Sequence, residues 1–145
     1  MPRRAVLSDE QRMALLALPD DETTLVQHWT LSEDDLAIIV RRRRPHNRLG
    51  FAIQLCALRY PGRLLRPGEL IPDTPLAFVA EQLQIAPEVL ADYATRGPTR
   101  YEQLDALREG FGFTQFSRPL RAALQEWLLP IALTTTSGAG LARSL

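Results

Sequence analysis

Four consecutive arginines at residues 41–44 are the clearest chemical signal in this sequence, and the segment PHNR, residues 45–48, follows them directly. Guanidinium groups bind phosphates through strong charge-assisted hydrogen bonds, and the release of counterions adds to the affinity of such a block for a DNA duplex. Pro45 fits the first position of a helix, whose free backbone N–H groups form an anion site beside the arginines. The segment therefore predicts contact with nucleic acid.

The arginines have a second explanation, which the sequence leaves open. Four adjacent residues on a helix spread around its circumference, so they cannot all face one partner. Cations at the carboxyl end of a helix also complement its dipole and pair with acidic neighbours. If the segment binds nucleic acid, the residues expected to contact phosphates are Arg41, Arg42, Arg43, Arg44 and Arg48. Asn47 is then expected to contact a base edge. The basic surface would be extended by Arg59, Arg63 and Arg66.

The distribution of charge along the chain supports nucleic-acid binding, although the net charge of the whole chain does not. The formal net charge is zero, with 17 arginines, no lysine and 17 acids. Residues 1–35 hold three arginines and eight acids, residues 36–68 hold eight arginines and no acid, and residues 69–145 hold six arginines and nine acids. The positive charge thus forms a single block.

Other kinds of chemistry find no support in the sequence. It has neither a glycine-rich phosphate loop nor a GxSxG motif, and its acidic clusters at residues 20–22 and 33–35 are typical of solvated helix starts. Cys56, His28 and His46 are too few for a structural zinc site. We expect no enzymatic activity, no metal and no cofactor.

Composition places the chain among globular proteins. Of its 145 residues, 46% are hydrophobic and 23% are charged. No apolar run is long enough to span a membrane, and the start MPRRAVLSDEQR lacks the apolar stretch of a signal peptide. We therefore expect a soluble, intracellular protein without a membrane partner.

Hydrophobic spacing and capping signals predict an all-α bundle of about seven to eight helices. A capping box at Ser8 and Gln11 opens the first helix, and Ser32 with Asp35 opens the third, which runs into the arginines and carries Arg41 to Arg43 on its last turn. The predicted helices cover residues 8–18, 22–29, 33–44, 45–60, 74–85, 87–95, 99–110 and a long stretch from 117, with Pro130 as a candidate kink.

The helix at residues 45–60 is apolar on two faces, which predicts a central place in the bundle. Trp29 and Trp127 have apolar neighbours and are expected in the core. We expect three parts: residues 1–62 as a helical subdomain with the arginine run, residues 63–73 as a connector, and residues 74–145 as a second helical subdomain. The last five residues, LARSL, are typical of the first turn of a further helix, so the second subdomain is expected to be truncated.

Residues 78–94 have the layout of a helix-turn-helix, with small Ala80 at the helix crossing. Gln84 occupies the turn position where such motifs favour glycine. The second helix would present Thr95 and Arg96 outward to a DNA groove, next to two acids that a phosphate backbone disfavours. An ordinary pair of packed helices explains the same pattern.

Residues 41–65, RRRRPHNRLGFAIQLCALRYPGRLL, resemble the amino-terminal domain of the Tn-three family of replicative transposases. The opening PRRAVLS, the S-x-x-D-L-x-I-I pattern of residues 32–39 and the T-R-x-E-x-L pattern of residues 99–104 are also similar to that family. The resemblance implies an amino-terminal region that recognises the terminal inverted repeats of the transposon. It also implies a downstream nuclease domain with a magnesium-bound triad of Asp, Asp and Glu, which these 145 residues do not include.

Together these features predict a non-catalytic, DNA-binding transposase module whose partner is the double-stranded DNA of the terminal inverted repeats. Two alternatives remain. One is a module that joins transposase subunits, and the other is a truncated competitor that occupies transposon ends and damps transposition.

Overall fold

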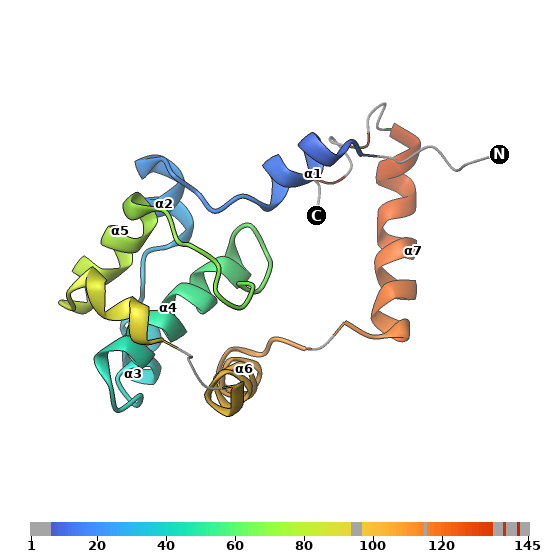
Figure 1. Cartoon of the computed structure of the whole chain (residues 1–145). Coiled ribbons are helices and arrows are strands. Elements are labelled where there is room, and N and C mark those ends of the chain that lie inside the picture. Colours follow the sequence, from blue (N-terminus) through green and yellow to red (C-terminus); the bar gives the residue numbers. More distant parts are fainter. Residues whose placement is uncertain (1–6, 94–96, 115, 135–137, 139–141, 143–145) are drawn as a thin grey trace. The chain divides into compact units, whose positions relative to one another are not determined.

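The computed structural model describes residues 7–93, 97–114, 116–134, 138 and 142. Within that part of the chain it contains seven α-helices, one 3-10 helix and no strand (Figure 1), which confirms the predicted all-α class. The helices are α1 (Asp9–Leu16), α2 (Glu22–His28), α3 (Glu33–Ile39), α4 (Pro45–Arg59), α5 (Asp73–Leu83), the 3-10 helix η1 (Pro87–Asp92), α6 (Gly97–Phe111) and α7 (Arg118–Thr134).

The chain divides into two compact units. The larger unit is Leu18–Phe113 and holds α2 to α6 with the arginine run. The smaller one combines Met1–Ala17 with Thr114–Leu145 and holds α1 and α7. None of the described helices is long and apolar enough to cross a membrane.

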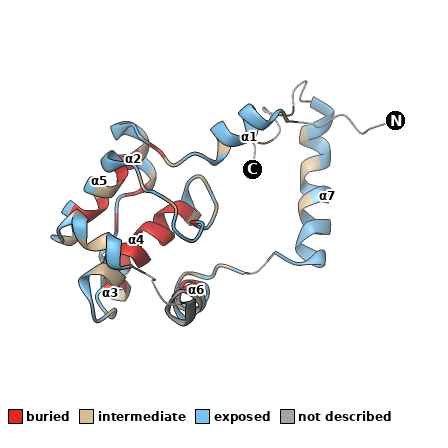
Figure 2. Cartoon of the chain, viewed as in Figure 1, coloured by how far each residue is buried: buried red, intermediate tan, exposed pale blue. Residues whose placement is uncertain are grey.

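Helix α4 forms the centre of the larger unit, as its two apolar faces predicted. Residues 49–57 are all buried, and Figure 2 shows most of the buried positions of this unit on α4. Other fully or nearly fully buried side chains come from neighbouring elements, among them Leu25, Trp29, Ile39, Val79 and Leu107. Burial of a large aliphatic or aromatic side chain contributes about 1.5–3 kcal/mol, so this cluster supplies most of the driving force for folding the unit.

Partly buried hydrogen bonds connect the segments around α4. The indole Nε1 of Trp29 donates to the backbone oxygen of Tyr60 at 2.9 Å. Gln82 of α5 accepts from the backbone N–H of Leu31 at 2.8 Å and donates to the backbone oxygen of Trp29 at 3.1 Å. The Trp29 bond thus fixes the end of α2 to the end of α4, and the Gln82 bonds fix α5 to the segment that follows α2.

Asp35 connects α3 to α4. Its side chain is 5% exposed and receives two hydrogen bonds of 2.7 Å from the guanidinium group of Arg59. It also accepts from the backbone N–H of Ser32, whose hydroxyl accepts in turn from the backbone N–H of Asp35, so the predicted capping box is present. The bonds from Arg59 lower the pKa of Asp35, and the same contacts raise the pKa of Arg59.

Gly50 permits a close approach of the segment after η1 to α4. A Cβ atom at this position would lie 2.1 Å from Cδ2 of Tyr93. No side chain fits at that distance, so the ring of Tyr93 occupies the space that only a glycine leaves open. The glycine of the N-R-L-G-F-A stretch therefore has a packing role.

The prediction that α3 continues into the arginines is wrong. The helix ends at Ile39, and Arg41, Arg42 and Arg43 lie in the turn that follows instead of on a last helical turn. The backbone oxygens of Val40 and Arg42 accept hydrogen bonds from the side chain of Arg48 at 3.1 Å and 2.7 Å, which stabilises the turn over a continued helix.

The segment after Pro87 also differs from its prediction. It is a 3-10 helix that ends at Asp92, whereas an α-helix to about residue 95 was expected. Gln84 has φ 55°, the left-handed conformation at the turn position that favours glycine. Val89 and Leu90 pack against the core, as the residues of an ordinary packed segment do.

Two further differences concern the later helices. Helix α6 begins at Gly97, two residues before the predicted cap at Thr99. Trp127 of α7 is 51% exposed, so its predicted place in the core is wrong, whereas Trp29 is fully buried as expected. Most of the predicted tail loop and the predicted extra helical turn at the end of the chain lie outside the described residues.

Candidate nucleic-acid interface

Residues 41–44 form the turn between α3 and α4, which we call the arginine turn. The backbone N–H of Arg42 donates to the oxygen of Ile39 at 3.0 Å, so the turn keeps part of a helical hydrogen-bond pattern. Arg41, Arg43 and Arg44 are exposed, and Arg42 is half-buried. Within the described part of the chain, no ion pair involves any of these four guanidinium groups. Their charge therefore remains available to a ligand.

Helix α4 begins directly after the turn. Pro45 occupies its first position, and Arg44 at the N-cap makes no side-chain capping bond. The start of a 15-residue helix carries a partial positive charge and backbone N–H groups without intrahelical partners. The helix dipole and the arginines thus favour an anion at the same place.

Arg48, predicted to contact phosphate, has another use in the structure. Its Nε donates to the backbone oxygen of Arg42 at 2.7 Å and its Nη2 to that of Val40 at 3.1 Å. The guanidinium group therefore holds the arginine turn in shape through two backbone carbonyls. We infer that Arg48 is a positioning residue for the other arginines.

This role gives a testable expectation. Replacing Arg48 with Met removes two charge-assisted bonds and should destabilise the unit by about 1–3 kcal/mol. Arg48→Lys should recover only part of the loss, because one ammonium group cannot reproduce the planar fork that reaches both carbonyls. Urea unfolding followed by circular dichroism measures both variants, and full stability of Arg48→Lys would contradict the role.

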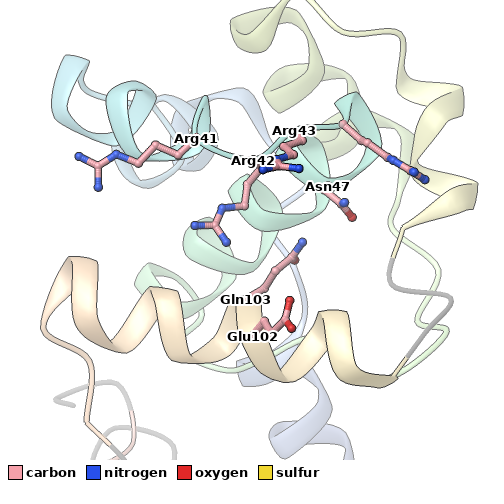
Figure 3. A pocket seen from close by; sticks show the side chains of 7 residues that line it. Arg41, Arg42, Arg43, Asn47, Glu102 and Gln103 are labelled. Atoms are coloured by element: carbon pink, nitrogen blue, oxygen red, sulfur yellow. The ribbon is translucent and has the colours of Figure 1, made fainter.

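A groove of about 380 Å³ opens beside the arginine turn. The four arginines and Asn47 line one side, and Glu102 and Gln103 of α6 line the other. Figure 3 shows Glu102 and Gln103 rising from α6 toward the turn, with Arg42 and Asn47 directed into the same space. We call this hollow the arginine groove.

Arg42 forms the inner part of the groove. Its guanidinium carbon lies 5.1 Å from the centre of the buried Phe51 ring, a distance typical of a cation–π contact. Its Nε is buried and, within the described residues, has no hydrogen-bond partner. Phe51 thus fixes the side chain, and one of its polar donors lies buried without a partner beside the groove.

The other predicted site residues are not brought to this groove. Arg59 is bound to Asp35, and Arg63 forms two hydrogen bonds of 2.8 Å and 2.9 Å with the carboxylate of Glu69. The bonds from Arg63 lower the pKa of Glu69. Thr95 and Arg96, the predicted groove-reading residues, lie outside the described residues.

Glu102 and Gln103 were not among the predicted site residues. They belong to the T-R-x-E-x-L segment, but nothing in that pattern indicates that α6 folds back against the arginine turn. The fold-back is visible only in the tertiary packing: Leu107 is buried in the core, and the ring of Phe111 lies tilted against that of Phe51 with 6.4 Å between ring centres. A long-range contact of this kind leaves no local signal.

The fold and this surface define an all-helical domain with a cationic groove, and no cluster of possible metal ligands occurs in the portion that the structure describes. The chain belongs to the family described as a domain of unknown function, DUF4158, whose model matches residues 6–145. It corresponds to the amino-terminal region of Tn-three family transposases, which confirms the resemblance noted for residues 41–65.

Several transposases are similar to the chain over its length. It is 43% identical over 145 residues to the transposase for transposon Tn21 of Escherichia coli, covering 100% of this chain and 15% of that protein. It is 44% identical over 147 residues to the transposase for transposon Tn3926 of Escherichia coli, with the same two coverages. The transposase for transposon Tn501 of Pseudomonas aeruginosa is 39% identical over 142 residues, which cover 98% of this chain and 14% of that protein. The chain thus spans about 15% of the length of these relatives.

Proposed function

We propose that this chain is a DNA-binding module that recognises the terminal inverted repeats of a transposon and contributes no catalytic group to their cleavage. The observation that carries the proposal is the arginine turn, where four adjacent guanidinium groups without ion pairs in the described part lie at the start of α4. Four unpaired like charges repel one another, and a phosphate backbone relieves that repulsion. The family supports the same partner, since the similar proteins are named as transposases.

The structure changes how we divide the arginines between binding and folding. We propose that Arg41, Arg43 and Arg44 contact phosphates, because their side chains are exposed. Arg48 holds the turn, and Arg59 and Arg63 hold the fold through their carboxylate partners. Thr95 and Arg96 remain proposed contacts to a DNA groove.

Replacing Arg41 and Arg43 with Gln tests the phosphate contacts. The double variant should bind every duplex more weakly, and each lost phosphate contact should reduce the slope of log K against log salt by about 0.9. Fluorescence anisotropy with a transposon-end duplex and a scrambled duplex, across a salt series, measures both quantities. Wild-type protein should prefer the end duplex.

Arg108→Gln is the matched control for this experiment. Arg108 is an exposed arginine of the same unit, but it pairs with Asp105 at 3.2 Å and lies outside the groove. Its replacement should leave the salt slope unchanged. Equal slopes for the control and the double variant would contradict phosphate binding by the arginine turn, and equal affinity of the wild type for both duplexes would contradict recognition of the ends.

A second function has a separate observation in its favour. Trp127, Leu129 and Leu133 of α7 are 51%, 61% and 80% exposed, and none of the residues described in α7 is buried. Exposed apolar side chains on one helix are typical of a protein contact, so α7 supports a module that joins transposase subunits. Concentration-dependent self-association without DNA, measured by analytical ultracentrifugation, favours this function, and a monomer at all concentrations opposes it.

A further inference from the structure

We propose that the arginine groove receives one unpaired nucleotide of the bound DNA, with its phosphate on the arginine turn and its base edge on Asn47, Glu102 and Gln103. The proposal rests on the DNA-binding function above. It adds which part of the DNA enters the groove and which side chains read it.

Two polar atoms of residues that line the groove are buried without a partner, which favours a ligand at this place. Gln103 is only 2% exposed, yet its Oε1 has no hydrogen-bond partner within the described residues. The Nε of Arg42 is also buried and has no hydrogen-bond partner within the described residues. Buried polar groups are nearly always paired, because leaving one unpaired costs about 1–3 kcal/mol. One of these two atoms accepts a hydrogen bond and the other donates one, so a ligand that offers both a donor and an acceptor would satisfy them together once the two side chains turn toward the groove.

The charges on the two sides of the groove suit two different parts of a nucleotide. A phosphodiester carries acceptors only, and the carboxylate of Glu102 repels it. No ion pair within the described residues joins Glu102 to the arginines on the opposite side of the groove. A carboxylate accepts readily from the N–H groups of a nucleobase. The side of the groove formed by α6 is therefore suited to a base edge, and the arginine side is suited to the phosphate of the same nucleotide.

The shape of the groove favours a base that has left the helical stack. Bases in a duplex lie at the floor of a groove and are read by protruding side chains, whereas this site is itself concave. A nucleotide turned out of the duplex, or at an unpaired end, projects and fits a hollow of about 380 Å³. Among the bases, guanine matches best, because it offers N1–H and N2–H donors to a carboxylate and O6 and N7 acceptors to a guanidinium group.

The test compares three short duplexes of one sequence: fully paired, with one unpaired guanine, and with an abasic site at that position. Fluorescence anisotropy should show the wild type binding the unpaired-guanine duplex about tenfold more tightly than the abasic duplex, the discrimination of one good base contact. Gln103→Leu should lose this preference. It should remain folded, because leucine is of similar size and removes an unpaired polar atom.

The Glu102→Ala variant should change two binding properties that the loss of a purely structural residue would not change in this combination. It should lose the preference for guanine while binding the abasic duplex more tightly, since a negative charge beside the phosphates is removed. Glu109→Ala is the control, because Glu109 is an exposed acid of α6 outside the groove, and it should keep the preference.

The outcomes distinguish this proposal from the function on which it rests. If the wild type binds guanine and abasic duplexes equally while Arg41→Gln with Arg43→Gln weakens both, the groove binds phosphate alone and the nucleotide site is overturned, with the DNA-binding function intact. If the wild type binds none of the duplexes, both proposals are overturned. A preference for guanine that survives in Gln103→Leu and Glu102→Ala also overturns the site.

Discussion

Replacing Gly50 with Ala should destabilise the larger unit by about 2–3 kcal/mol, the cost of forcing extra volume into a packed site. The new Cβ would lie 2.1 Å from the ring of Tyr93, so the ring or the backbone after η1 has to move. Urea unfolding followed by circular dichroism gives the change in free energy. A double-mutant cycle identifies the cause: Gly50→Ala should cost far less in a Tyr93→Ala background than in the wild type.

Gly110→Ala is the matched control, since Gly110 also lies in a helix. There the nearest atom to a new Cβ is Cδ1 of Ile38 at 3.6 Å, an ordinary van der Waals distance. Alanine has a higher helix propensity than glycine by up to about 1 kcal/mol, so this variant should be neutral or more stable. A Gly50→Ala protein as stable as Gly110→Ala would show that Tyr93 does not constrain this position.

Replacing Asp35 should have the second large effect. Asp35→Ala removes both the bonds from Arg59 and the capping bond to Ser32, and should cost about 3 kcal/mol, at the lower end for a broken buried pair because the Arg59 side chain is 32% exposed and regains water. Asp35→Asn can still accept from Ser32 and should cost less. Asp34→Asn, an exposed acid of the same helix, should change the free energy of unfolding by less than about 0.5 kcal/mol.

The lowered pKa of Asp35 also predicts a dependence on pH. A carboxyl group whose pKa is lower in the folded than in the unfolded state binds fewer protons when folded, so its contribution is complete above the unfolded pKa of about 3.9 and is lost as the pH falls through the folded pKa. The wild type should therefore lose stability steeply below about pH 4. The Asp35→Asn variant should lose less over the same range, and parallel curves for the two proteins would contradict the assignment.

Local signals in the sequence predicted where helices start. Ser8 and Ser32 form their capping boxes, and Pro45 begins α4, because a cap depends only on residues within one turn of it. The central place of α4 was also predictable, because a helix that is apolar on two faces must be covered by other elements on both.

Helix ends and pairings were less predictable, because they depend on contacts from distant residues. Arginine is a good helix former, so nothing near Ile39 indicated that α3 stops there, and the hydrogen bonds from Arg48 become apparent only in the folded chain. Proline at position 87 starts an α-helix and a 3-10 helix equally well.

Only the part of the candidate site that is contiguous in the sequence could be predicted, because the rest depends on long-range contacts. The arginine turn and Asn47 are adjacent in the sequence and were found there. Gln103 comes from a helix more than 50 residues away, and only its burial and missing partner mark it. Likewise, the carboxylates that bind Arg59 and Arg63 could not be chosen from the many acids in the chain.

The two tryptophans differ in a way that makes each a separate optical reporter. Trp29 is fully buried in the larger unit and Trp127 is 51% exposed in the smaller one, so their emission should differ in wavelength and in quenching by iodide. In a Trp127→Phe protein, the remaining emission comes from Trp29 alone and its red shift records the opening of the core around α4. In a Trp29→Phe protein that stays folded, Trp127 would instead report whatever covers α7.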